Sequence, residues 1–215
     1  MLGFLHKKTT RRILGEFGFS ESAQTLVVSS CVWPDAVRYF DDRYHAQTPL
    51  RSDGRPQPAD EAALRFSLLL SVLINKIQSD EPAERLVWLG CCLHLVQDLA
   101  VHQGNTGPEH FWQLFWLWKF PDIAPADVRR ARDFSRQFLS AIRMKFGEAF
   151  WHDLKTTPIP ALTPNQLRQR LLGKSDFSWR SVFQFVRSVW QYLWWPRSAK
   201  RTRWDIAAVL RQALQ

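Results

Sequence analysis

The residues best suited to chemistry lie in one short segment, where His94, Asp98 and His102 follow one another at intervals of four positions. On a helix this spacing places the three side chains along one stripe, with a drift of about 40° and a rise of about 6 Å per step. The preceding residues are largely apolar, so the stripe faces a helical core, where burying these groups carries a desolvation cost. Metal coordination compensates that cost, and the segment predicts a zinc site.

Further residues of metal-binding types stand on both sides of this segment. They are His6, Asp35, His45, Glu109 and His110. The last two follow a turn cluster at 103–108, which we expect to return them to the end of the same helix. Helical metalloproteins gather carboxylates and imidazoles from several helices in this way. The alternative is a set of polar core contacts with other histidines at the surface, and we interpret His152 as a structural or surface residue.

The elements that position these residues are predicted to be helices, because helical periodicity dominates and strand signals are scarce. The fold class is therefore all-α, a multi-helix bundle with a buried polar metal site. We expect helices at 6–17, 21–30, 33–40, 60–78, 81–101, 109–120, 126–146, 164–172, 178–195 and 203–214. Turn-rich loops are expected at 46–59 and 155–164. The length of 215 residues fits a single domain, 1–215.

Charge divides the chain into two unlike parts. Residues 1–110 hold 11 Lys and Arg against 13 Asp and Glu, whereas residues 111–215 hold 18 against 7, together with nine of the eleven Trp. A basic, Trp-rich part from about residue 155 predicts an anionic partner, either phospholipid headgroups or nucleic acid. The segment 179–195 interleaves aromatic and basic residues, which suits peripheral contact with a membrane or single-stranded nucleic acid. An ordinary core-packing helix followed by a basic loop is the alternative.

The sequence also carries signals of location. The three cysteines include the adjacent pair Cys91 and Cys92, which argues against a disulfide framework and favours the cytoplasm. No signal peptide is evident at the N-terminus, and the apolar runs at 66–74 and 86–96 are too short to span a bilayer. We therefore expect a cytoplasmic protein, peripheral to a membrane if it contacts one.

The pattern His-x-x-x-Asp-x-x-x-His, preceded by an N-terminal His and an Asp…His pair, resembles the zinc-dependent phospholipase C / S1–P1 nuclease superfamily. Its members are all-helical enzymes with a cluster of three zinc ions. The resemblance covers about the first 110 residues. It implies up to three Zn²⁺, with the ligands His6, Asp35, His45, His94, Asp98, His102, Glu109 and His110. It further implies that Asp98 bridges two ions, and that Gln97 and Asn105 orient ligands or substrate.

The activity implied by the resemblance is phosphodiester hydrolysis by metal-activated water, with Asp35 and Asp98 as the catalytic residues. Phospholipid is the favoured substrate, and an S1/P1-like nuclease is the nearest alternative. A third interpretation is a non-catalytic helical metal-binding protein that docks a membrane or partner. It is favoured by two differences from the secreted members, namely Met1 in place of an N-terminal Trp and the shortened spacing from Asp98 to His102.

Overall fold

The computed structural model describes residues 3–38, 41–79, 81–109, 124–158, 162–173, 175, 178–193 and 203–215. The fold is all-α, as predicted, and the described residues form no strand beyond an isolated bridge between Leu50 and Pro56. In chain order the helices are α1 (Gly3–Glu16), α2 (Glu21–Ser30), α3 (Trp33–Val37), the 3-10 helix η1 (Asp42–His45), α4 (Ala59–Lys76), α5 (Pro82–His102), α7 (Pro125–Thr156), α8 (Pro164–Leu172), α9 (Trp179–Leu193) and α10 (Ile206–Leu214).

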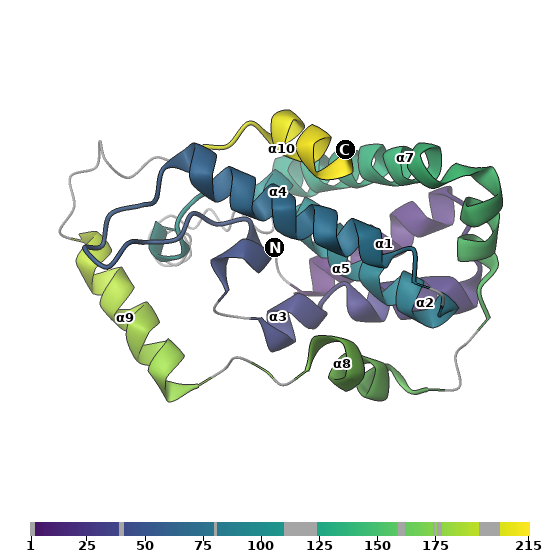
Figure 1. Ribbon diagram of the computed structural model, residues 1–215, viewed down its shortest axis with the longest axis horizontal. Coiled ribbons are helices and arrows are strands. Elements are labelled where there is room, and N and C mark those ends of the chain that lie inside the picture. Colours follow the sequence, from purple (N-terminus) through teal and green to yellow (C-terminus); the bar gives the residue numbers. More distant parts are fainter. Residues whose placement is uncertain are drawn as a thin grey trace.

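Helix α5 lies at the centre of the molecule and packs against α1, α2, α3, α4, α7 and η1 (Figure 1). Each residue from Leu86 to His102 is buried, which includes the predicted stripe of polar side chains. A helix buried around its whole circumference needs neighbours on every side, and the surrounding helices supply them. The stripe therefore points into the protein interior, where other elements can contribute further ligands.

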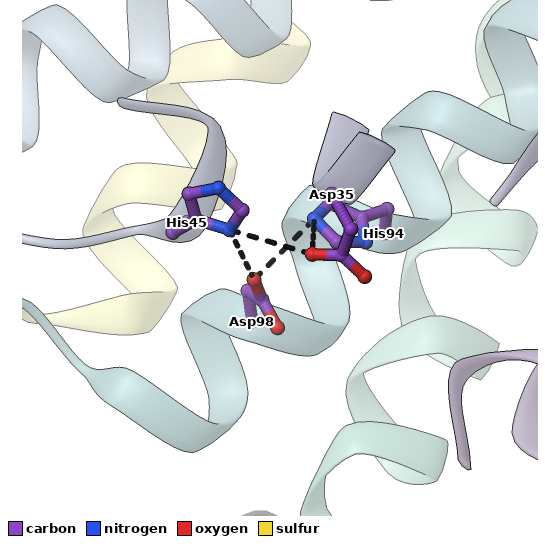
Figure 2. Close-up of side chains that lie close together, drawn as sticks. All are labelled: Asp35, His45, His94 and Asp98. Carbon is purple, nitrogen blue, oxygen red and sulfur yellow. Dashed lines mark hydrogen bonds and ion pairs between the residues drawn. The ribbon is translucent and has the colours of Figure 1, made fainter. Parts of the chain in front are cut away.

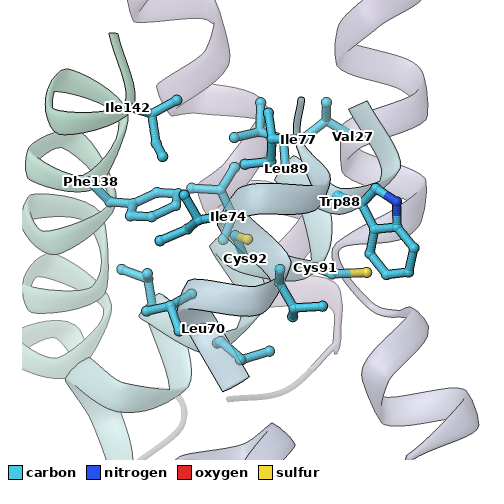
Figure 3. Close-up of a cluster of buried hydrophobic side chains, with 14 of the residues drawn as sticks. Val27, Leu70, Ile74, Ile77, Trp88, Leu89, Cys91, Cys92, Phe138 and Ile142 are labelled. Atoms are coloured by element: carbon cyan, nitrogen blue, oxygen red, sulfur yellow. The ribbon is translucent and has the colours of Figure 1, made fainter. Parts of the chain in front are cut away.

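Apolar side chains from α2, α4, α5 and α7 fill the core around the N-terminal half of α5 (Figure 3). Ile74 of α4 and Phe138 of α7 are almost completely buried there, close to Leu89 and Cys92 of α5. All three cysteines are buried and unpaired. Helices α8 and α10 belong to the same cluster, so the chain beyond the predicted proline-rich loop shares this core. Their contributions are Leu167, Leu172, Val209, Leu210 and Ala213.

The predicted helices agree with the structure apart from a few boundaries. Helix α2 has the predicted bounds, and α3 ends at Val37 instead of residue 40. The predicted end at 146 coincides with a break in α7, beyond which a second helical stretch runs to Thr156. Gly147 interrupts the helical geometry of α7 with φ 84°, a value that glycine adopts without strain, and the helix then resumes. The predicted helix 109–120 lies outside the described residues beyond its first residue, and so does the end of 178–195.

None of the described helices is both long and apolar enough to cross a lipid bilayer.

Candidate metal centre

Four side chains from three separate elements converge on one point (Figure 2). They are Asp35 of α3, His45 of η1, and His94 and Asp98 of α5. One ligand atom from each residue lies within 4.8 Å of the corresponding atoms of the other three. Asp98 Oδ2 is 3.4 Å from both His45 Nδ1 and His94 Nε2, and Asp35 Oδ1 is 3.6 Å and 3.7 Å from the same two nitrogens.

The other carboxylate oxygen of Asp98 faces a second pair of imidazoles. Its Oδ1 lies 3.1 Å from His6 Nε2 of α1 and 3.5 Å from His102 Nε2 of α5. The ring centroids of His6 and His94 are 4.4 Å apart, so the two groups of ligands adjoin. Asp98 thus stands between two sets of nitrogen atoms, with one oxygen directed at each.

The hydrogen bond of His45 to the backbone directs the other ring nitrogen at the carboxylates. His45 Nε2 lies 3.1 Å from the carbonyl oxygen of Arg38, and because a carbonyl only accepts, this nitrogen carries the hydrogen and donates it. In the neutral ring Nδ1 then bears the lone pair, which faces the acceptor oxygens of Asp35 and Asp98. A cation between these atoms turns that contact into coordination, and a backbone carbonyl is a usual second partner of a metal-binding histidine.

Gln97 imposes a similar arrangement on His6. The Oε1 atom of Gln97 accepts a hydrogen bond from His6 Nδ1 at 2.8 Å, and its Nε2 donates to Thr10 Oγ1 at 3.0 Å. Thr10 lies one turn after His6 on α1, so the two helices are joined by this network. The lone pair of neutral His6 therefore lies on Nε2, directed at Asp98. This contact supports the predicted orienting role of Gln97.

The loop that carries His45 is held against the C-terminal end of α5. His45 ends η1, and the next residue, Ala46, has the left-handed φ of 50° and accepts a hydrogen bond from Gly104 N through its carbonyl oxygen. Thr48 N donates to the carbonyl oxygen of Asn105 at 3.1 Å. Trp204 Nε1 in turn donates to Thr48 Oγ1 at 3.2 Å. These bonds place His45 over the turn of α5 that bears Asp98.

The charged groups of the centre shift one another's pKa values. Burial raises the pKa of Asp35, and the nearby Asp98 carboxylate raises it further. Burial alone would raise the pKa of Asp98, but positive charge around it holds that pKa well below its usual range. Burial holds the pKa of His94 well below its usual range, whereas Asp98 and Asp35 outweigh burial and raise that of His45. An ionised Asp98 and a neutral His94 are in the protonation states that bind metal ions.

The nitrogen–oxygen distances in the four-residue cluster are longer than in ordinary hydrogen bonds and close to those within a zinc shell. Distances of 3.4–3.7 Å between nitrogen and oxygen exceed the usual 2.7–3.2 Å of such hydrogen bonds. A tetrahedron with zinc–ligand bonds of 2.0–2.2 Å has edges of about 3.3–3.6 Å. Among the described residues, moreover, neither ring nitrogen of His94 has a hydrogen-bond partner, although His94 is fully buried.

The structure brings six of the eight predicted ligands together. Glu109 follows the turn after α5, where its N–H donates to Thr106 Oγ1, and it is not one of the four clustered ligands. His110 lies outside the described residues. His152 is exposed on α7, in agreement with its interpretation as a surface residue.

Sequence reasoning missed two supporting groups. Thr10 shares a helical face with His6 at a spacing of four, a signal that could have identified it. The carbonyl of Arg38, which orients His45, has no signal in the side-chain pattern because it belongs to the backbone.

The chain matches no protein-family model, no curated protein and no solved structure. The resemblance to the zinc-dependent phospholipase C / S1–P1 nuclease superfamily therefore rests on the residues and spacings given above, and membership stays a prediction.

Proposed function

We propose that the centre binds zinc and that the protein hydrolyses phosphodiesters, in the manner of a phospholipase C. The observation that carries the proposal is the convergence of His and Asp donors at spacings suited to zinc, with Asp98 directing one oxygen at each of two sets of nitrogens. His45, His94 and Asp35 would hold one ion with Asp98, and His6 and His102 would hold a second. A third ion, which the resemblance implies, would need ligands such as Glu109 and His110.

The accessibility of the centre favours a catalytic role. His94 and Asp98 are at most 1% exposed, whereas Asp35 is 32% exposed and His45 is 12% exposed, so one side of the centre faces solvent. Bound zinc supplies Lewis acidity, which polarises a phosphoryl oxygen and lowers the pKa of water. Asp35 is the most accessible of the four, so its carboxylate is the one placed to accept a proton from an attacking water if it is not itself a zinc ligand.

Phospholipid is the substrate class that we favour, because the C-terminal part of the chain combines tryptophan with a positive charge. A single-stranded nucleic acid has the same phosphodiester chemistry and is the alternative substrate. The metal-binding residues do not distinguish the two substrates, so an assay with both substrates must decide between them.

A structural metal site is the second candidate function, and one observation favours it. Asp35, His45, His94 and Asp98 would fill all four positions of a tetrahedral zinc shell, as in closed structural sites, whereas catalytic sites keep one position open. In this interpretation zinc joins α3, η1 and α5 without performing chemistry. Zinc would then be bound and would stabilise the fold, but no phosphodiester would be hydrolysed.

The test combines a metal count with an activity assay on the full chain. We expect at least two zinc ions per chain by elemental analysis, and hydrolysis of phosphatidylcholine or single-stranded DNA that stops on chelation and returns with zinc. His94→Ala and Asp98→Asn should reduce hydrolysis to background and lower the zinc content. Circular dichroism checks that both variants remain folded.

His152→Ala is the matched control, because it removes an exposed histidine from α7 and should alter neither zinc content nor hydrolysis. A chain that binds zinc but cleaves neither substrate would establish the structural interpretation. A chain that binds no zinc would contradict both the catalytic and the structural interpretation.

A further inference from the structure

Helix α9 exposes a continuous apolar stripe along one face. Its members are Trp179 (75% exposed), Phe183 (71%), Val186 (57%) and Trp190 (62%). Their spacings of four, three and four place them within about 60° of one another around the helix axis. Single exposed apolar residues are common in proteins, but a row of four that includes two tryptophans marks an interaction surface.

The other faces of α9 differ from the stripe, because one packs against the protein and another carries positive charge. Val182 and Phe185 are half-buried, and the ring of Phe185 lies near Gly107 in the turn region that follows α5. Arg180 and Arg187 are exposed and lie along the opposite edge of the apolar stripe. One side of the helix, with Val182 and Phe185, thus packs against the protein, and the apolar stripe faces outward. The two arginines lie along the far edge of the stripe.

We propose that α9 is an interfacial helix, whose stripe of Trp179, Phe183, Val186 and Trp190 enters the surface of an anionic lipid bilayer while Arg180 and Arg187 contact phosphate headgroups. Tryptophan prefers the boundary between headgroups and acyl chains, and arginine beside it binds anionic lipid. Helix α9 lies at one end of the molecule, where a flat surface can reach it (Figure 1). The proposal does not depend on the metal centre.

Two other occupants fit these observations less well. A second copy of the chain would bring two sets of arginines and two net charges of +9 together, which opposes association. Nucleic acid would pair with the arginines and stack on the aromatic rings, but it gains nothing from Val186 in the middle of the stripe. A lipid surface uses both the charge and the whole apolar stripe.

The test measures binding of the full chain to sedimented vesicles of phosphatidylcholine with and without phosphatidylglycerol. We expect binding to the anionic vesicles, and at least about tenfold weaker binding after Phe183→Ser combined with Val186→Ser, because both apolar groups lose their burial. Arg180→Gln and Arg187→Gln should each weaken binding to the anionic vesicles about fivefold and leave the neutral vesicles unaffected.

The matched control is Leu68→Ser combined with Val72→Ser, which removes two apolar residues of α4 with exposures of 55% and 53%. We expect this variant to bind the anionic vesicles as the parent does, with or without zinc. Equal binding by the Phe183/Val186 variant and the parent would overturn the proposal. The proposal would also be overturned if the parent were a dimer in analytical ultracentrifugation and the Phe183/Val186 variant a monomer. The same holds if the variant lost binding to a single-stranded oligonucleotide while its binding to vesicles stayed unchanged.

Discussion

His6 and His45 each use one ring nitrogen for support and direct the other at Asp98. The support comes from the Gln97 side chain in the first case and from the Arg38 carbonyl in the second. In both rings the supporting acceptor fixes the tautomer, so the nitrogen that faces Asp98 is the one with a lone pair. A carboxylate surrounded by lone pairs is stable only with protons or metal ions between them, and this is the residue-scale reason for assigning a cation to the centre.

Gln97 gives a test of this argument that does not remove any ligand. Gln97→Ala deletes the acceptor for His6 Nδ1 and should weaken zinc binding about 10- to 100-fold, the usual effect of losing a group that orients a ligand. Competition with a coloured zinc chelator measures the change. Thr10→Val, which removes only the far partner of Gln97, should have a smaller effect. Unchanged zinc affinity in Gln97→Ala would show that His6 is not a ligand.

Asp42, in η1, should make stability depend on pH. Burial raises the pKa of its carboxyl from 3.8 to about 6, so the folded chain holds this proton more tightly than the unfolded chain does. The free energy of unfolding therefore falls as pH rises from about 4 to about 6, and stays lower above that window. Asp42→Asn cannot ionise and should be more stable than the parent by about 1–2 kcal/mol at pH 7, but not at pH 4. Urea unfolding at both values measures this, and an equal difference at both would contradict it.

At the scale of elements, helices α2 and α5 cross at Gly90. A Cβ atom added at Gly90 would lie 2.1 Å from Ser30 Oγ and 2.7 Å from the carbonyl oxygen of Val27. Only glycine allows this approach, and the crossing fixes the position of α5 against α2. The depth of α5 in the protein, and hence the burial of its polar stripe, depends on this contact.

Gly90→Ala should therefore destabilise the protein by about 1–3 kcal/mol, because backbone or Ser30 must move to admit a methyl group. Gly15→Ala in α1 is the matched control, since nothing lies within 4 Å of a Cβ there. It should be neutral or stabilising by up to about 1 kcal/mol, as alanine favours helix. The two variants are compared by denaturant unfolding, and similar free energies would refute close packing at Gly90.

The bounds of a helix could be predicted from the sequence where local signals mark its ends. Helix α2 starts after Ser20, whose side chain accepts a hydrogen bond from Ala23 N, and it ends at the predicted Ser30. The break in α7 was predictable from Gly147, whereas the second helical stretch beyond it, which runs to Thr156, was not. Its continuation depends on tertiary contacts, including burial of Trp151.

At the scale of the whole molecule, the spacing along α5 predicts that His94, Asp98 and His102 share one stripe, since all three lie on one helix. The convergence of His6, Asp35 and His45 on this stripe was expected from their residue types and from the resemblance, but not from any periodic spacing. Their placement depends on loop contacts such as Trp204 with Thr48, which join residues 156 positions apart and leave no periodic signal. Local periodicity therefore predicted the three residues on α5, whereas long-range packing brings the other three residues to them.

Removing zinc from the proposed site should lower the stability of the whole molecule, because the residues of the site join α1, α3, η1 and α5. Burial and then the neighbouring Asp98 carboxylate raise the pKa of Asp35, and a cation would relieve the repulsion between the two carboxylates. Zinc at a hundred times its Kd should add about 2.7 kcal/mol and raise Tm by roughly 5–10 °C in a chain of this length. Differential scanning calorimetry with zinc and with chelator measures the shift. His94→Ala should show a much smaller response, and an equal rise in Tm for that variant would place the stabilising zinc outside this centre.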